Sequence, residues 1–195
     1  MSNLYQDVLN DILSCKLFTD DRGNIYGPQY EPYLSHTTGV WQIPEELAGL
    51  VEWLADKNVC SFLNVGTFNG ATFNLISKYI KKFNTGACCI SIDPINHNPV
   101  MADGLIYENK TSFDYIGRSF DLVFIDGDHT YECVKQDFDN VGKHARYCVF
   151  HDIRDKYIGA MACGGVVRFW EEIKTQYGLA VSSSSNDLLY SLYNS

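Results

Sequence analysis

The chain has 195 residues, a length typical of one compact domain. Apolar residues make up 46% of it and charged residues 20%, which excludes a disordered or collagen-like chain. The formal net charge is −9, and the sequence contains no basic tract. Because Lys and Arg side chains neutralise phosphate when a protein binds nucleic acid or anionic lipid, this composition disfavours both kinds of partner.

The sequence contains seven cysteines, an odd number, with no Cys-x-x-Cys pair. Several lie in apolar runs, where a free cysteine behaves as a small apolar side chain. We therefore expect reduced core cysteines in a cytoplasmic protein rather than a disulfide framework or a zinc site. The N-terminal residues lack the features of a signal peptide, and no apolar run is long enough to span a membrane.

Residues 1–58 are predicted to form two helices joined by a lid-like loop. Apolar residues recur at helical spacing over residues 3–17. Residues 20–39 combine turn-forming residues, prolines and several tyrosines, a composition typical of a long ordered loop that binds or covers a ligand. Pro44 and the two glutamates after it favour the start of a second helix.

From residue 59 onward, short apolar runs alternate with helical stretches. Strands buried on both faces have this composition, and the alternation indicates βαβ units around a parallel sheet. The predicted strands are 61–65, 87–92, 104–107, 122–125 and 147–150. The predicted helices lie near 70–82, 131–144 and 165–177, with the last beginning after Gly164-Gly165.

Two more apolar runs between Leu179 and Tyr193 are separated by a serine-rich segment. No crossover helix fits between them, so we expect them to pair antiparallel as a terminal hairpin. The whole chain, 1–195, is then a single domain, in which residues 59–195 form the core.

A glycine-containing turn follows the first strand of this core. Gly66 allows the chain to turn sharply off the strand, and Gly70 allows a helix to start close to the sheet or to a ligand. Asp93, at the end of the next strand, suits hydrogen bonds from a ribose diol. Packing alone also explains two glycines in such a turn, and an aspartate before a proline also forms turns. The three-glycine dinucleotide fingerprint is absent.

Acidic residues follow two further strands. Asp126 and Asp128 come after one apolar strand, and His151 and Asp152 come after another. If these strands are neighbours, their carboxyl ends lie about 4.8 Å apart at one edge of the sheet. Two carboxylates so close repel each other unless a cation or a shared proton lies between them, and oxygen ligands suit Mg²⁺. The alternative is that these acids only cap helices.

Together these motifs resemble the class I S-adenosylmethionine-dependent methyltransferases, especially the small metal-dependent sugar O-methyltransferases of the macrolide and aminocoumarin type. The resemblance covers about residues 40–193, including the helix that begins near Gly165. It implies a Rossmann-like, doubly wound, mostly parallel sheet of seven strands with a C-terminal antiparallel hairpin. The motifs that carry it are Asn64-Val65-Gly66-Thr67, Gly70, Asp93, Asp126-Gly127-Asp128-His129 and His151-Asp152.

The resemblance also implies roles for single residues. Asp128 corresponds to the general base, and Asp126, His151 and Asp152 correspond to the ligands of a divalent metal ion, Mg²⁺ or Mn²⁺. Asp93 corresponds to the residue that binds the ribose, and Ser112 to one near the adenine. The full set of implied S-adenosylmethionine-binding residues is Asn64, Gly66, Thr67, Asn69, Gly70, Asp93, Ser112 and Asp126.

Two of these positions depart from the family pattern. Asn64 stands where the family usually has an acid, and it can still accept a hydrogen bond from the amino group of the cofactor, without a charge. His151 also replaces an acid, and because imidazole binds Mg²⁺ less readily than carboxylate does, a softer ion such as Mn²⁺ also fits.

The function implied is methyl transfer to a hydroxyl of a small molecule, with a sugar or glycan as the expected acceptor and a catechol-like phenol as another. Two alternatives stay open. The first is a non-catalytic protein that binds the cofactor, which Asn64 and His151 favour. The second is an NAD-dependent oxidoreductase, which the missing third glycine and the expected hairpin disfavour. The sequence leaves the oligomeric state open.

Overall fold

The computed structural model describes residues 3–14, 42, 44–153 and 160–177. At its centre lies a parallel sheet of five strands in the order β3-β2-β1-β4-β5. The strands are β1 (Ser61–Val65), β2 (Cys88–Ile92), β3 (Ile106–Glu108), β4 (Leu122–Ile125) and β5 (Tyr147–Phe150). The helices are α1 (Asn3–Ser14), α2 (Pro44–Leu54), α3 (Ala71–Phe83), α4 (Tyr131–Asn140) and α5 (Ala160–Tyr177), with 3-10 turns η3 (Ser112–Tyr115) and η4 (Gly142–His144).

The predicted α/β architecture with a parallel sheet is confirmed, and its arrangement is Rossmann-like. The described sheet has five strands rather than the expected seven. The expected terminal hairpin falls in residues 178–195, outside the described residues. The assignment of residues 1–195 to a single domain stays a prediction.

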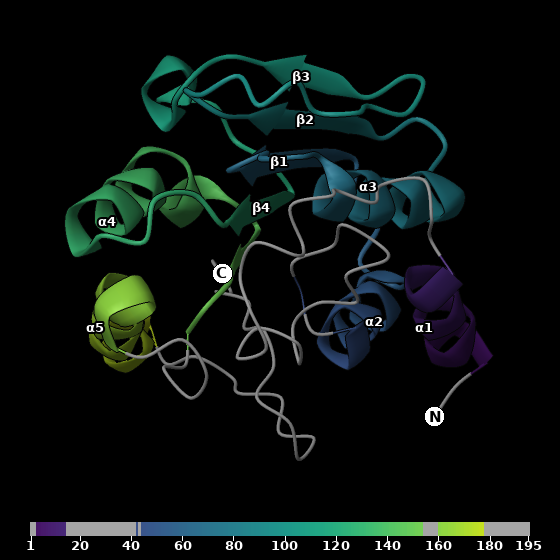
Figure 1. Cartoon of the computed structure of the whole chain (residues 1–195), viewed down its shortest axis with the longest axis horizontal. Coiled ribbons are helices and arrows are strands. Elements are labelled where there is room, and N and C mark those ends of the chain that lie inside the picture. The colour runs from purple at the N-terminus through teal and green to yellow at the C-terminus, as the bar shows by residue number, and fades with distance from the viewer. Residues whose placement is uncertain (1–2, 15–41, 43, 154–159, 178–195) are drawn as a thin grey trace.

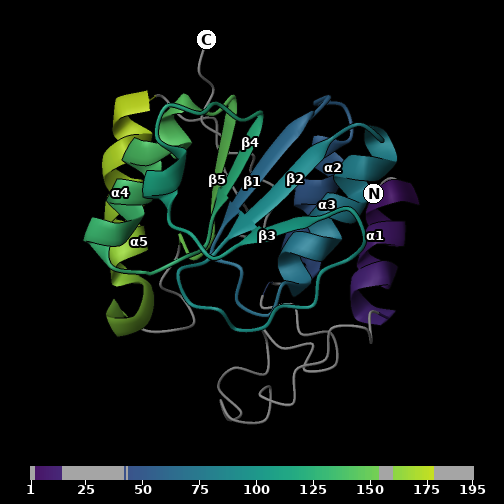
Figure 2. The same ribbon diagram turned by 90° about the horizontal axis from the view of Figure 1, so that it is seen from above.

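Helices cover both faces of the sheet. Figure 1 shows α1, α2 and α3 on one side and α4 and α5 on the other, and Figure 2 shows the same two layers from above. Each layer has its own apolar core, and successive strand residues alternate between the two. In β4, for example, Phe124 packs in the first core while Val123 and Ile125 pack in the second. This burial on both faces explains why the strands are apolar throughout.

All the strands end at one edge of the sheet, and the functional candidates follow them directly. Backbone hydrogen bonds continue the strand ladder into three of the turns. Gly66 N donates to Ile92 O (2.9 Å), Asp126 N to Val65 O (2.9 Å) and His151 N to Ile125 O (3.1 Å). The first residues of these turns are therefore held as firmly as the strands themselves.

Gly66 has φ +93°, and a Cβ atom at this position would lie 1.9 Å from the backbone oxygen of Asp126. Only glycine fits, because any side chain would collide with the backbone of the neighbouring turn. The turn after β1 and the turn after β4 are thus in direct backbone contact.

The glycine pair at 164 and 165 lies inside α5, which begins at Ala160, so the prediction that this helix starts after the pair is wrong. A Cβ at Gly165 would lie 2.3 Å from both His129 O and Tyr131 N. The glycine therefore serves a close approach between α5 and the turn before α4, rather than a helix start. The predicted helix over 131–144 likewise ends early, at Asn140, and continues as η4.

The cysteines were expected to be reduced core residues, and no segment was expected to span a membrane. Cys60, Cys88, Cys89, Cys133 and Cys148 are free, and Cys89 and Cys148 are buried as expected. Cys60 and Cys88 are exposed, contrary to a core role, because they lie where β1 and β2 begin, at the opposite edge of the sheet from the acidic turns. Within the described ranges, no helix is long and apolar enough to cross a membrane.

The glycine pair in α5 provides a matched test of this packing. Gly165→Ala should lower the free energy of unfolding by about 1–3 kcal/mol, because the added methyl group collides with a backbone that cannot retreat easily. Gly164→Ala should raise it by roughly 0.5–1 kcal/mol, since no described atom lies within 4 Å of the new methyl group and alanine favours helix. Urea unfolding measures both, and equal effects would contradict the close approach.

Candidate functional site

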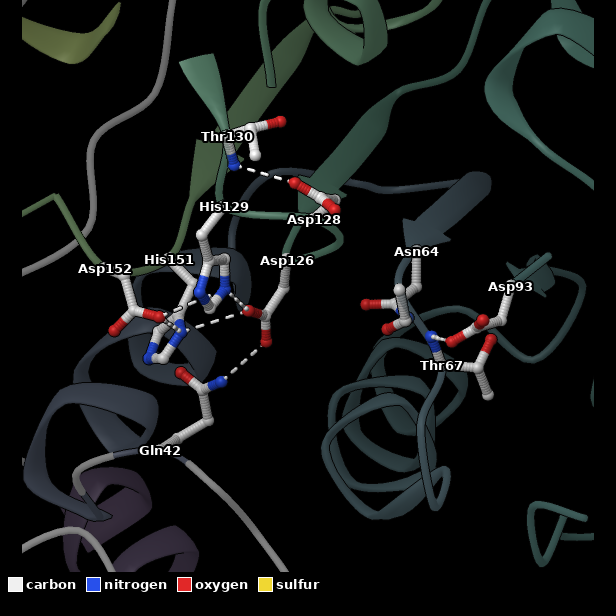
Figure 3. A network of polar contacts seen from close by, with 11 residues as sticks. Gln42, Asn64, Thr67, Asp93, Asp126, Asp128, His129, Thr130, His151 and Asp152 are labelled. Atoms are coloured by element: carbon white, nitrogen blue, oxygen red, sulfur yellow. Dashed lines mark hydrogen bonds and ion pairs between the residues drawn. The ribbon is translucent and has the colours of Figure 1, made fainter. Parts of the chain in front are cut away.

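Two polar networks lie side by side along the carboxyl edge of the sheet (Figure 3). The first centres on Asp93, which is 8% exposed. Its Oδ2 accepts hydrogen bonds from the backbone N–H groups of Thr67 and Phe68, both at 3.0 Å, and its Oδ1 accepts one from Ile95 N at 2.8 Å. Each carboxylate oxygen has two lone pairs, so Oδ1 can accept one more hydrogen bond.

Asn64 belongs to the same network and is almost fully buried. Its Nδ2 donates to Gly66 O at 2.7 Å and to Ser91 Oγ at 2.8 Å, and the hydroxyls of Ser91 and Thr67 lie 2.6 Å apart. Both amide hydrogens are therefore used within the protein. Among the described residues, none donates to Oδ1 of Asn64, which leaves an acceptor at the position where the sequence analysis expected one.

Asn74, which the sequence analysis missed, fixes the other side of the glycine turn. Its Nδ2 donates to Gly70 O (2.7 Å) and Val100 O (2.6 Å), and its Oδ1 accepts from Ala102 N (2.7 Å). The segment after β2 is thereby fastened over the start of α3, next to Asn69, whose O accepts from Val100 N. The one signal in the sequence is an amide on a mainly apolar face of α3, which also holds Ser77.

The second network joins the ends of β4 and β5. Nδ1 of His151 lies 3.1 Å from Asp126 Oδ1 and 3.0 Å from Asp152 Oδ2. Nε2 of His129 lies 3.3 Å from Asp152 Oδ2 and 3.7 Å from Asp126 Oδ1. Gln42, which is 4% exposed, donates from Nε2 to Asp126 Oδ2 at 3.0 Å. Figure 3 shows these five side chains converging on one point.

The charges in this network compensate one another. Burial on its own raises the pKa of Asp126, but the positive charge of His151 and hydrogen bonds from both histidines outweigh burial and lower the pKa to about 2. Burial likewise lowers the pKa of His151, but Asp126 and Asp152 outweigh it and raise that pKa well above its ordinary value. The raised pKa favours the protonated form of His151, whose Nδ1 lies within 3.1 Å of one oxygen of each carboxylate.

The donor set also fits a divalent metal ion. Asp126, His129 and Asp152 each offer one ligand atom, and these three atoms lie within 4.8 Å of one another. The sequence analysis named His151 as the third ligand and missed His129. The available signal was position, because His129 lies in the same short turn after β4 as Asp126. Carboxylate and imidazole are both common ligands of first-row divalent ions.

Asp128 lies beside this network rather than in it. Its side chain is exposed, and Oδ1 accepts a hydrogen bond from Thr130 N at 2.8 Å, just before α4. Hydrogen bonds from the backbone and then the side chain of Thr130 hold the pKa of Asp128 below its ordinary value. Thr130 is the N-cap of α4, so Asp128 orders the turn before the helix rather than capping it, and its general-base role stays a prediction.

Ser112 lies in neither network. It is 2% exposed, donates from Oγ to Asp137 Oδ1 at 2.6 Å and accepts from Asn140 Nδ2 at 3.0 Å, so it ties η3 to α4. Its role near the adenine stays a prediction. Burial, helped by the negative charge of Asp128, raises the pKa of Asp137 to about 6. The hydrogen bond from Ser112 acts in the opposite direction and lowers that pKa.

The acids at positions 93, 126 and 152 thus follow β2, β4 and β5 at one edge of one sheet, as the sequence analysis expected. β1, which carries Asn64, lies between the strands that precede Asp93 and Asp126, and the contact between Gly66 and Asp126 joins the two networks. The edge therefore presents hydrogen-bond acceptors next to a carboxylate–imidazole cluster.

Comparisons with known proteins agree with this arrangement. Residues 63–153 match the family model of a methyltransferase domain, which spans both networks apart from Gln42. The chain resembles the class I S-adenosylmethionine-dependent methyltransferases. This confirms the resemblance drawn from the motifs. No curated protein sequence matches the chain.

Several solved structures share the fold of these methyltransferases. The O-methyltransferase NovP is 12% identical, with all of both chains covered and a TM-score of 0.64. TomG from Streptomyces achromogenes, in complex with SAM, is 14% identical over all of both chains, with a TM-score of 0.56. MycE, in complex with Mg, SAH and mycinamycin VI, is 16% identical with a TM-score of 0.52, over 85% of this chain and 54% of MycE. At such identities, the likeness establishes the fold.

The buried Asp137 gives a prediction about stability and pH. Its pKa is about 6 in the folded protein and 3.8 ordinarily, so its contribution to stability is present below pH 3.8 and lost as the pH rises through 6. Asp137→Asn should therefore raise the free energy of unfolding by roughly 1–3 kcal/mol at pH 8, and by less at pH 5.

Urea unfolding at the two pH values measures this effect. The matched control is Asp139→Asn on the same helix, whose carboxylate pairs with Lys135 and Lys143 and whose loss should not stabilise the protein. A gain for Asp137→Asn that is the same at both pH values would show that ionisation of this carboxyl is not the cause.

Proposed function

We propose that the protein transfers a methyl group from S-adenosylmethionine to a hydroxyl of a small molecule, with a sugar or glycan as acceptor and a divalent metal ion as a second cofactor. One observation carries the proposal: the free acceptors of Asn64 and Asp93 lie on the same sheet edge as the cluster of Asp126, His129 and Asp152. A methyl donor and a polarised acceptor hydroxyl need sites that are adjacent in this way.

The first network supplies the proposed cofactor site. Oδ1 of Asp93 keeps a lone pair for a ribose hydroxyl, and Oδ1 of Asn64 accepts from the amino group of the methionine part. Gly66 holds the turn after β1 against the backbone of Asp126, which fixes where this network lies beside the second one. The proposed set also includes Thr67, Asn69, Gly70, Ser112 and Asp126.

The second network supplies the proposed acceptor site. The carboxylates of Asp126 and Asp152, with an imidazole of His129 or His151, would hold the metal ion, which supplies Lewis acidity toward the acceptor oxygen. The C–S bond of the sulfonium breaks as the C–O bond to the acceptor forms, and the hydroxyl proton passes to Asp128. Methyl transfer needs in-line approach, so the fixed strand ends contribute mainly by positioning.

The metal ion and the class of acceptor rest on separate support. The metal is supported by the donor set and by the Mg in the MycE complex. A small-molecule acceptor is supported by the mycinamycin VI in the same complex, and a sugar hydroxyl by the motifs of the sequence. We also propose a cytoplasmic location, which the free described cysteines support.

Calorimetry with S-adenosylhomocysteine tests the cofactor site. Asp93→Asn should weaken binding by about tenfold or more, because a hydrogen bond to a charged group contributes roughly 1.5–3 kcal/mol. The control is Asp103→Asn, an exposed carboxylate in the segment after β2. No binding to the unmodified protein at millimolar ligand would refute the proposal, and bound cofactor that no acceptor consumes would favour the non-catalytic alternative.

Asp128→Asn separates the two roles of Asp128. Asparagine keeps an oxygen that can accept the hydrogen bond from Thr130 N, so the protein should be nearly as stable, within about 0.5 kcal/mol. The variant lacks the basic carboxylate, so transfer of a labelled methyl group should fall by about 100-fold or more. Unchanged turnover with unchanged stability would leave Asp128 with ordering the turn before α4 as its role.

A further inference from the structure

The second network contains more nitrogen than a magnesium site needs. Mg²⁺ prefers oxygen ligands and retains several water molecules, whereas imidazole favours Mn²⁺, Fe²⁺, Co²⁺ and Zn²⁺. Two imidazoles, those of His129 and His151, contact the same pair of carboxylates from Asp126 and Asp152. The question is which imidazole is placed to bind an ion and which is placed to support the carboxylates.

His129 is placed as a ligand. Its Nε2 lies 3.3 Å from Asp152 Oδ2 and 3.7 Å from Asp126 Oδ1. Two ligands bound at about 2.1 Å to one ion lie about 3.0 Å apart at an octahedral angle and about 3.4 Å apart at a tetrahedral angle. The two distances from the nitrogen are therefore close to the spacing that a common ion requires, and all three donor atoms lie within 4.8 Å of one another. The backbone of His129 is also fixed, because Gly165 packs against it.

His151 and Gln42 are placed as supports. Both histidines direct one nitrogen at both carboxylates, but the side chain of His151 is 15% exposed against 33% for His129, and its ring stacks on the buried Phe124 with 6.5 Å between centroids and 24° between planes. Gln42 donates to Asp126 Oδ2, the oxygen opposite the one that His151 and His129 contact. Such outer contacts orient the carboxylates that bind a metal ion and tune their affinity.

We propose that Asp126, His129 and Asp152 bind a first-row transition-metal ion in preference to Mg²⁺, while His151 and Gln42 orient the carboxylates without binding the ion. The proposal rests on the proposed function for the place of the metal site, and it revises the ligand set that the sequence suggested. The imidazole of His129 is the donor that sets the preference.

Titration with Co²⁺ tests the ligand directly, because its visible absorption spectrum changes when a nitrogen ligand replaces oxygen. The unmodified protein should bind Co²⁺ at least about tenfold more tightly than Mg²⁺, measured by calorimetry of each metal alone. His129→Asp, which makes the site all-oxygen, should reduce this preference by about tenfold or more and alter the Co²⁺ spectrum.

Two further variants complete the design. His151→Gln should weaken Co²⁺ and Mg²⁺ together by about 10- to 100-fold and keep the preference between them. His144→Asn, at an exposed histidine in η4 away from the site, should leave the affinity for both metals unchanged. Binding of S-adenosylhomocysteine to every variant reports folding and tests the cofactor site separately.

Three results would overturn the inference. The first is Mg²⁺ binding to the unmodified protein as tightly as Co²⁺. The second is a preference that survives in His129→Asp and disappears in His151→Gln. The third is no metal binding by a protein that still binds S-adenosylhomocysteine, a result that would leave the methyltransferase proposal standing without its ion.

Discussion

The contact between Gly66 and the backbone of Asp126 is the constraint on which the rest of the site depends. A Cβ at Gly66 would lie 1.9 Å from Asp126 O, so the turn after β1 and the turn after β4 are pressed together. The turn after β1 belongs to the network of Asn64 and Asp93. The turn after β4 belongs to the carboxylate–imidazole cluster. The distance between the proposed donor and acceptor sites is therefore set by backbone rather than by flexible side chains.

The cluster itself illustrates how a protein holds two carboxylates together. Asp126 and Asp152 repel each other in isolation, and His151, whose Nδ1 contacts one oxygen of each, offsets that repulsion when its imidazole is protonated. Gln42 then satisfies the remaining oxygen of Asp126. Because the partners come from three separate segments of the chain, namely Gln42, the turn after β4 and the turn after β5, the cluster forms only when those segments are already in place. The site is thus a product of the tertiary fold and not of any one motif.

Sequence reasoning succeeded where local pattern and topology were sufficient. The strands could be predicted because burial on both faces makes them apolar throughout, and the acids could be placed on one edge because parallel strands share their carboxyl ends. Sequence reasoning could not predict the roles of Gln42 and Asn74 or the orientation of His129, since each depends on contacts between distant segments. The glycine pair misled the analysis because Gly165 is required by a neighbouring turn, which no local pattern reveals.

The position of Gln42 has a consequence for observing this protein in solution. Its side-chain amide bonds directly to Asp126, and the residue stands immediately before α2, two positions ahead of Pro44. In a nitrogen-15 NMR spectrum the Gln42 NH₂ pair is a built-in reporter whose two proton resonances sense the charge on that carboxylate. A shift of this one pair of peaks would report a change in protonation or in the contacts of Asp126, without any chemical probe being attached at the cluster.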